Sequence, residues 1–250
     1  MQHFNFCAGP AMLPAEVMQQ AQAEMLDWQG CGSSVMAISH RSAPFIEVAQ
    51  QAEQDLRELL NVPQNYKVLF LQGGGRGQFA AAPLNIASPE QTSLHLVTGS
   101  WSKGAVSEAA KYTQTHVVAK DAINAENKRY VPEASTWDAP DVVLKNAAYL
   151  HYCPIETVDG IALYTPQRLH NIDLVADMSS NIMSVPINMQ DYGVIYAGAQ
   201  KNIGPSGLAV VIVREDLLGK AQPATPSFIN YTLAAEHDSM YNTPPTYSWY

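Results

Sequence analysis

Short apolar runs recur along the chain, and helical stretches separate most of them. The clearest runs lie at residues 67–71, 93–97, 116–118, 147–151, 174–176, 194–196 and 208–213. Strands that alternate with helices favour an α/β fold with a mainly parallel sheet and helices on both faces. Too little chain separates the last two runs for a crossover helix, so one strand there is expected to be antiparallel.

Helix signals surround these strands. Residues 14–30 are predicted as one helix, because Pro14 stands at its first turn and Gly30 just past its end. A second helix is predicted over 43–60, and an alanine-rich third from 79 to about 86. The second has an apolar stripe formed by Phe45, Val48, Ala52, Leu56, Leu59 and Leu60. The polar segment 121–140 is predicted to be a loop or a short meander.

The charge balance limits the classes of partner. The 250 residues include 14 Lys and Arg against 23 Asp and Glu, a net charge of −9. This balance argues against nucleic acid or an anionic membrane as the main partner, since both need a basic surface. No apolar run is long enough to span a membrane, and the first residues lack a signal-peptide pattern.

The cysteines argue against a disulfide framework and against a metal site. Cys7, Cys31 and Cys153 are widely spaced, and no Cys-x-x-Cys pair occurs. We therefore expect no bound metal and a reducing, cytoplasmic location.

Lys201 is the residue that most strongly indicates a chemistry. It lies among small residues and glycines, between the apolar runs 194–196 and 208–213. Burial disfavours its ammonium form, and a neutral amine can attack a carbonyl. Asp177 follows the apolar run 174–176. A lysine that forms a Schiff base and an acid that holds a pyridinium nitrogen are the two partners that pyridoxal phosphate needs. A buried Lys–Asp ion pair without a cofactor is the alternative.

Other candidates follow strands or precede helices. The glycine run at 73–77 could bind an anion at a helix N-terminus, although it matches neither a Rossmann fingerprint nor a P-loop. Trp101 could stack on a flat ring or belong to the core. Thr157 could hydrogen-bond a cofactor or cap a turn. His40 and Arg41 could bind a phosphate or carboxylate, with a surface ion pair as the alternative reading of the arginine.

Several motifs together resemble the phosphoserine aminotransferases, class V members of the fold-type I pyridoxal phosphate enzymes. These motifs are Ala8-Gly9-Pro10, Ser39-His40-Arg41, Gly73-Gly74-Gly75-Arg76-Gly77-Gln78, Asp177-Met178-Ser179-Ser180, Gly198-Ala199-Gln200-Lys201-Asn202 and Asn242-Thr243-Pro244-Pro245-Thr246. The resemblance implies the large domain of that fold, with residues 1–15 as an N-terminal arm and 16–250 as the cofactor-binding domain. It also implies a C-terminal small domain with further substrate-binding residues, which is absent from this chain. The substrate site would then be incomplete here.

The resemblance implies a role for each candidate. Lys201 would hold pyridoxal phosphate and transfer the substrate proton, and Asp177 would keep the ring nitrogen protonated. Trp101 would stack on the ring and Thr157 would contact its polar edge. The phosphate would be bound by Gly75, Arg76 and Gln200, and by Asn242 and Thr243 of a second subunit. The substrate's distal anionic group would be bound by Arg41, His40 and Arg76.

The implied reaction is transamination between O-phospho-L-serine and 2-oxoglutarate in serine biosynthesis, by a homodimer with a shared cofactor site. The phosphorylated hydroxythreonine step of pyridoxine synthesis is a related reaction. Two alternatives stay open: another class V enzyme, or a non-catalytic fragment that binds a phosphorylated ligand. The visible absorption of a bound cofactor would separate the last from the others.

Overall fold

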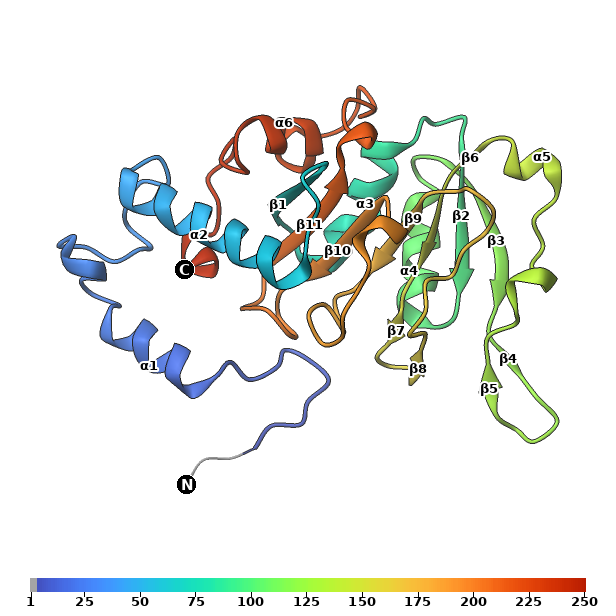
Figure 1. The fold of residues 1–250 in the computed structure, drawn as a ribbon, viewed down its shortest axis with the longest axis horizontal. Coiled ribbons are helices and arrows are strands. Elements are labelled where there is room, and N and C mark those ends of the chain that lie inside the picture. The colour runs from blue at the N-terminus through green and yellow to red at the C-terminus, as the bar shows by residue number, and fades with distance from the viewer. Residues whose placement is uncertain (1–3) are drawn as a thin grey trace.

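A seven-stranded sheet forms the centre of the fold in the described residues (Figure 1). The computed structural model describes residues 4–250. The strand order is β1-β11-β10-β9-β6-β2-β3. The strands are Tyr66–Gln72 (β1), Thr92–Val97 (β2), Gln114–Lys120 (β3), Ala147–Tyr152 (β6), Leu174–Asp177 (β9), Val194–Gly198 (β10) and Leu208–Arg214 (β11).

The sheet is parallel except at β11. This strand pairs antiparallel with β10 and with β1, whereas β10, β9, β6, β2 and β3 pair in parallel. The loop 199–207 between β10 and β11 is too short for a crossover helix, so the chain reverses direction there. The predicted α/β fold and its antiparallel strand are confirmed. Because of this topology, the carboxyl ends of the parallel strands and the start of β11 share one edge.

Helices cover both faces of the sheet. The α-helices of the described residues are Ala15–Ala23 (α1), which lies away from the sheet, Ala43–Leu60 (α2), Gly74–Ile86 (α3), Ser100–Ala109 (α4), Asp141–Leu144 (α5), Tyr231–Glu236 (α6) and Thr246–Trp249 (α7). Two small hairpins complete the fold: Ala122–Ile123 (β4) with Arg129–Tyr130 (β5), and Ile155–Glu156 (β7) with Ile161–Ala162 (β8). The first hairpin is the short meander that the polar segment 121–140 predicted.

The hydrophobic core has two layers because strand side chains alternate. In β10, Ile195 and Ala197 face the layer that contains residues of α2 and α7. Val194 and Tyr196 face the opposite layer, with residues of α3, α4 and α6. Strands buried on both faces explain the continuous apolar runs of the sequence.

The prediction of one helix over 14–30 is wrong, because α1 ends at Ala23. The chain turns after α1 so that Trp28 becomes fully buried and contacts the ring of Tyr250 edge-on. The Asp27 carboxylate supports the turn by accepting a 2.6 Å hydrogen bond from the Gly32 amide. Tertiary burial of one large aromatic side chain therefore overrides the local helix signal.

Two further expectations about helices also need correction. The third helix begins at Gly74 rather than Phe79, so the glycine run forms its first turn. Leu59, expected in the apolar stripe of the second helix, is 65% exposed. The buried face of α2 is formed instead by Phe45, Ala49, Leu56 and Leu60.

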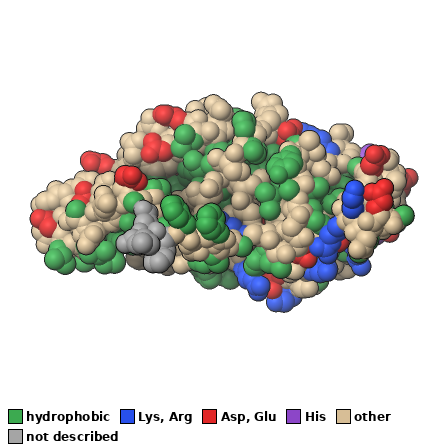
Figure 2. Space-filling model, turned by 90° about the horizontal axis from the view of Figure 1, so that it is seen from below, with side chains coloured by type: hydrophobic (Ala, Val, Ile, Leu, Met, Phe, Trp, Pro, Cys, Tyr) green, Lys and Arg blue, Asp and Glu red, His purple; other side chains and the backbone are tan. Residues whose placement is uncertain are grey.

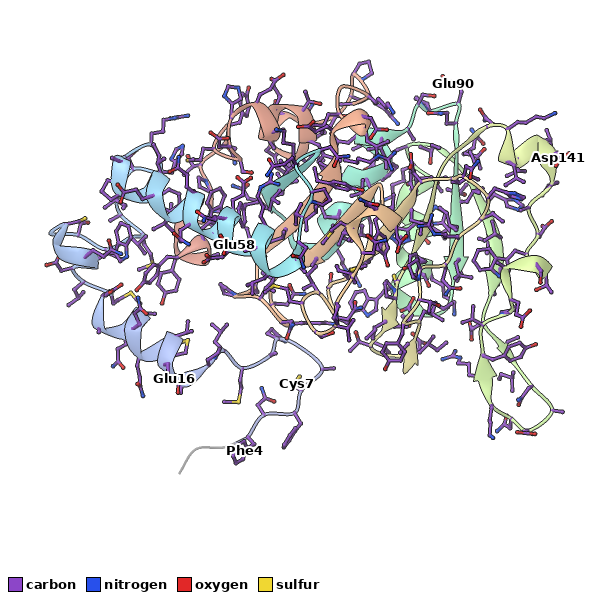
Figure 3. All side chains as sticks on the ribbon, viewed as in Figure 1. Phe4, Cys7, Glu16, Glu58, Glu90 and Asp141 are labelled. Atoms are coloured by element: carbon purple, nitrogen blue, oxygen red, sulfur yellow. The ribbon has the colours of Figure 1, made fainter. Side chains whose placement is uncertain are left out.

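Helix α1 stands apart from the main body of the molecule (Figure 1), whereas the segment before it reaches the loop after β10, where the Ala11 amide donates a 2.8 Å bond to the Gln200 carbonyl. Figure 3 shows Phe4 and Cys7 along this N-terminal segment and Glu16 on α1. On the face seen in Figure 2, hydrophobic side chains lie in its middle as well as at its left end. Ala21 is the buried residue of α1. Among residues 4–250, no helix combines the length and apolar character needed to cross a membrane.

Trp249 tests how the C-terminal segment stabilises the fold. Its ring lies 4.8 Å from that of Phe70 and 5.7 Å from that of Phe45, between β1 and α2. Trp249→Ala should lower the free energy of unfolding by about 3–5 kcal/mol, because it leaves a cavity between these elements. Urea unfolding measures the change. Leu59→Ala is the control and should stay within about 0.5 kcal/mol of the wild type; equal losses would contradict the packing role.

Candidate active site

A cavity of about 520 Å³ opens at the edge where the parallel strands end. Its volume lies within the range of small-molecule and cofactor sites. Ligands of open α/β sheets bind beyond the carboxyl ends of strands, which is where this cavity lies. Its walls include seven of the predicted site residues: Gly75, Arg76, Trp101, Thr157, Asp177, Gln200 and Lys201.

Lys201 projects into the cavity from the loop after β10. Its Nζ donates a hydrogen bond to Thr157 Oγ1 at 2.5 Å and another to Ser180 Oγ at 2.8 Å. The side chain is half-buried, and this burial lowers the pKa of Lys201 although the negative charge of Asp177 opposes the shift. The site therefore holds a lysine amine whose neutral form is favoured relative to a free lysine.

Asp177 ends β9 and lies beside the same cavity. Only 8% of the residue is exposed, and its Oδ1 accepts bonds from the Ser179 amide at 3.0 Å and the Ser179 hydroxyl at 2.5 Å. Burial raises the pKa of Asp177, and the Ser179 bonds and the Lys201 charge counteract the rise. Within residues 4–250, its Oδ2 accepts no hydrogen bond, so this oxygen is available to a ligand.

Two glycines allow α3 to approach the end of β10. A Cβ on Gly75 would lie 2.8 Å from Ser179 Oγ, and a Cβ on Gly198 would lie 2.9 Å from the Gly75 amide nitrogen. Ser179 Oγ also accepts a 2.9 Å bond from the Gly198 amide. This close backbone packing places the first turn of α3, whose first amides have no partner within the helix, at the wall of the cavity. Such an N-terminus binds phosphate readily.

Trp101 forms another wall, in the first turn of α4. The guanidinium carbon of Arg76 lies 5.3 Å from the centre of its ring, and Lys201 Nζ lies 5.9 Å from it. Its indole Nε1 is buried without a hydrogen-bond partner among the described residues. An aromatic surface beside a guanidinium and a lysine amine suits a flat anionic ligand.

Four predicted residues lie outside the cavity. Asn242 and Thr243 are exposed, and both contact Gln72 at the end of β1. Asn242 Nδ2 donates a 3.1 Å bond to Gln72 Oε1, and Gln72 Nε2 donates a 2.6 Å bond to the Thr243 carbonyl. His40 is buried beside α2, and this burial lowers the pKa of its imidazole. Arg41 is exposed. Within one chain, the structure does not bring these four to Lys201, so their roles stay predictions.

The sequence interpretation gave no role to two serines that the structure places in the site. Ser179 connects Asp177 to the end of β10, and Ser180 binds the Lys201 amine. Both directly follow the strand that ends at Asp177, and a pair of hydroxyls at that edge is the signal that could have identified them. The arm also contributes, because Ala8, Gly9 and Pro10 line the cavity.

Comparison with known proteins agrees with this geometry. The family described as aminotransferase class-V matches residues 3–250. The chain belongs to the class-V aminotransferases. The cofactor of this family is pyridoxal phosphate.

Solved structures of class-V aminotransferases resemble the whole chain. The phosphoserine aminotransferase from Bacillus circulans subsp. alkalophilus is 42% identical, with a TM-score of 0.90 over 98% of this chain and 66% of its own. The pyridoxal phosphate-bound phosphoserine aminotransferase from Trichomonas vaginalis is 37% identical, with a TM-score of 0.90 over 100% of this chain and 68% of its own. This chain thus spans about two-thirds of the length of these relatives.

The residues of the cavity fit pyridoxal phosphate. Asp177 Oδ2 is available for the ring nitrogen, the first amides of α3 for the phosphate, and the Trp101 indole for the ring face. The unpartnered Trp101 Nε1 and the tight glycine contacts are consistent with a site built around a ligand.

The buried lysine leads to a pH prediction. Acetic anhydride reacts with the neutral amine, so the reactivity of Lys201 should titrate below pH 10.5, the ordinary pKa of a lysine. Asp177→Asn should lower this pKa of Lys201 further, since the aspartate charge raises it. Peptide mass spectrometry across a pH series, with free Nα-acetyl-lysine as the standard, measures both. A midpoint at or above the standard would contradict the effect of burial.

Proposed function

We propose that this chain forms the cofactor-binding part of an enzyme that catalyses transamination between O-phospho-L-serine and 2-oxoglutarate, yielding 3-phosphooxypyruvate and L-glutamate. One observation carries the proposal: Lys201 Nζ and the Asp177 carboxylate face one cavity beside the free amides of α3. The resemblance over 98–100% of the chain to phosphoserine aminotransferases supports the choice of substrate.

Each cavity residue has a proposed task. Pyridoxal phosphate, when bound, withdraws electrons from the substrate α-carbon. Lys201 would hold the cofactor and would then accept the proton from the substrate α-carbon, which its lowered pKa favours. Asp177 keeps a proton on the ring nitrogen. Trp101 stacks on the ring, and Thr157 contacts its polar edge.

Anionic groups are bound by the remaining residues. Gly75, Arg76 and Gln200 would hold the cofactor phosphate, because the N-terminus of α3 favours an anion. Arg76 also attracts the substrate's phosphate, together with Arg41 and His40 in the assembled enzyme. We further propose that residues 16–250 form the large domain and that 1–15 form an arm over the cavity; residues 1–3 of this arm lie outside the described residues.

Borohydride trapping and a single-turnover assay test the function. Incubation with pyridoxal phosphate should produce a visible absorption band, and borohydride should fix the pyridoxyl group on the Lys201 peptide. In a separate sample that has not been reduced, O-phospho-L-serine should bleach the band at least about tenfold faster than L-serine, because an added charge-assisted contact is worth about 1.5–3 kcal/mol. Lys103→Ala is the control and should leave the label in place.

Two results would contradict the proposal separately. A label on Lys67 or Lys103 would overturn the assignment of the cofactor lysine. Equal bleaching rates for L-serine and its phosphate ester would overturn the phosphorylated substrate while leaving the cofactor assignment intact.

We also propose a homodimer with a shared cofactor site. Asn242 and Thr243 belong to an irregular segment in which Pro244 and Pro245 prevent strand pairing. Both polar residues are exposed and lie outside the cavity of their own chain. From a neighbouring subunit, their side chains reach the cofactor phosphate.

The shared site predicts that the cofactor favours the dimer. Replacing both Asn242 and Thr243 with alanine should weaken pyridoxal phosphate binding at least about tenfold, given about 1.5–3 kcal/mol for each charge-assisted bond. Sedimentation at several protein concentrations should show more dimer when the cofactor is added, since a ligand shifts an equilibrium toward the state that it binds better. Thr165→Ala, another exposed threonine, should change neither quantity. A monomer that binds the cofactor as tightly as the dimer would refute the shared site.

A further inference from the structure

Glu156, a buried residue that does not line the cavity, connects two of the cavity walls. Glu156 ends β7 and is 0% exposed. Its Oε2 accepts a bond from the Trp101 amide at 2.9 Å. Its Oε1 accepts bonds from the Ser102 amide at 2.8 Å and the Ser102 hydroxyl at 2.5 Å. The first turn of α4 is therefore anchored on one carboxylate.

Asp159, in the β7–β8 turn, completes this anchor. Its Oδ2 accepts a 2.6 Å bond from the Ser100 amide, and its Oδ1 lies 3.4 Å from Arg129 of β5. The Ser100 amide bond and the Arg129 charge contribute to lowering the pKa of Asp159. Two carboxylates at a helix N-terminus are stabilised by the helix dipole and form charge-assisted hydrogen bonds. They also satisfy the free amides of α4, whereas those of α3 stay available.

Gly99 is the residue that makes room for both carboxylates. A Cβ at this position would lie 2.4 Å from Asp159 Oδ2 and 2.7 Å from Glu156 Cδ. The glycine at the end of β2 is therefore required by close approach, since any larger residue would separate α4 from the β7–β8 hairpin.

The anchor lies next to two residues that face the cavity. Trp101 is bonded to Glu156 through its own amide, and Thr157 is the next residue in the chain. Thr157 Oγ1 accepts the 2.5 Å bond from Lys201, and the indole ring faces the same amine at 5.9 Å. Any shift of the Glu156 carboxylate would move the indole relative to the hydroxyl.

We propose that Glu156 is a positioning residue that sets the spacing between the Trp101 ring and the Thr157 hydroxyl, and thereby the affinity of the site for pyridoxal phosphate. The inference rests on the proposed function, because it requires that the cavity hold this cofactor. Glu156 itself does not line the cavity, so it acts through the backbone of α4 and of β7.

A double-mutant cycle tests the proposal. Pyridoxal phosphate affinity is measured by calorimetry for the wild type, Glu156→Gln, Trp101→Ala and the double variant. The glutamine removes the charge and one acceptor at constant size, and should weaken binding about tenfold, a factor that corresponds to about 1.4 kcal/mol. In the Trp101→Ala background most of this loss of affinity should disappear, because the ring that Glu156 positions is already gone. The effects of two coupled residues on a free energy are not additive. Glu215→Gln, which changes an exposed carboxylate paired with Lys67, should leave the affinity unchanged.

The outcomes distinguish this inference from the function on which it rests. A wild type that binds no pyridoxal phosphate would overturn both. A wild type that binds, with Glu156→Gln either harmless or equally damaging in both backgrounds, would overturn the positioning role alone. If Glu156→Gln does not fold, Ser102→Ala replaces it in the cycle, since it keeps the carboxylate and removes the hydroxyl that donates to Glu156 and accepts from the Thr98 and Gly99 amides. The same criterion of non-additivity then decides.

Discussion

The close contact between the start of α3 and the end of β10 is the constraint on which the site depends. Gly75 and Gly198 leave no room for a Cβ, and the Ser179 hydroxyl packs against Gly75 while it accepts a bond from the Gly198 amide. The same hydroxyl bonds Asp177, so the anion-binding end of α3 and the buried aspartate are set at a fixed separation. A single methyl group at either glycine would disturb helix, strand and carboxylate together.

Burial also determines the electrostatics of the cavity. Desolvation raises the pKa of Asp177 and lowers the pKa of Lys201, and each group partly counteracts the shift of the other. The hydroxyls of Thr157 and Ser180 hold the amine without adding charge. A neutral lysine close to an acid is the state that covalent and proton-transfer chemistry requires.

The N-termini of α3 and α4 both lie near the cavity, but their free backbone amides have different partners. The first turn of α3 keeps its amides free and contains Arg76, and we propose that it binds the cofactor phosphate. The first turn of α4 is already occupied by Glu156 and Asp159. In our proposal this turn positions Trp101 rather than binding a ligand. Carboxylates of the β7–β8 hairpin fill the N-terminus of α4, whereas the N-terminus of α3 lies at the wall of the cavity.

Local pattern and residue type determined much of this protein. The apolar runs predicted the sheet and its antiparallel strand, and the positions of Lys201 and Asp177 after buried strands indicated the chemistry, because strand ends in such sheets converge on one edge. Other features were decided by tertiary contacts. Trp28 ended α1 early because its burial outweighed helix propensity, and Ser179, Ser180 and Glu156 acquired roles only once distant strands came together. Hydrogen bonds between residues far apart in sequence leave no periodic signal, so only the folded chain reveals them.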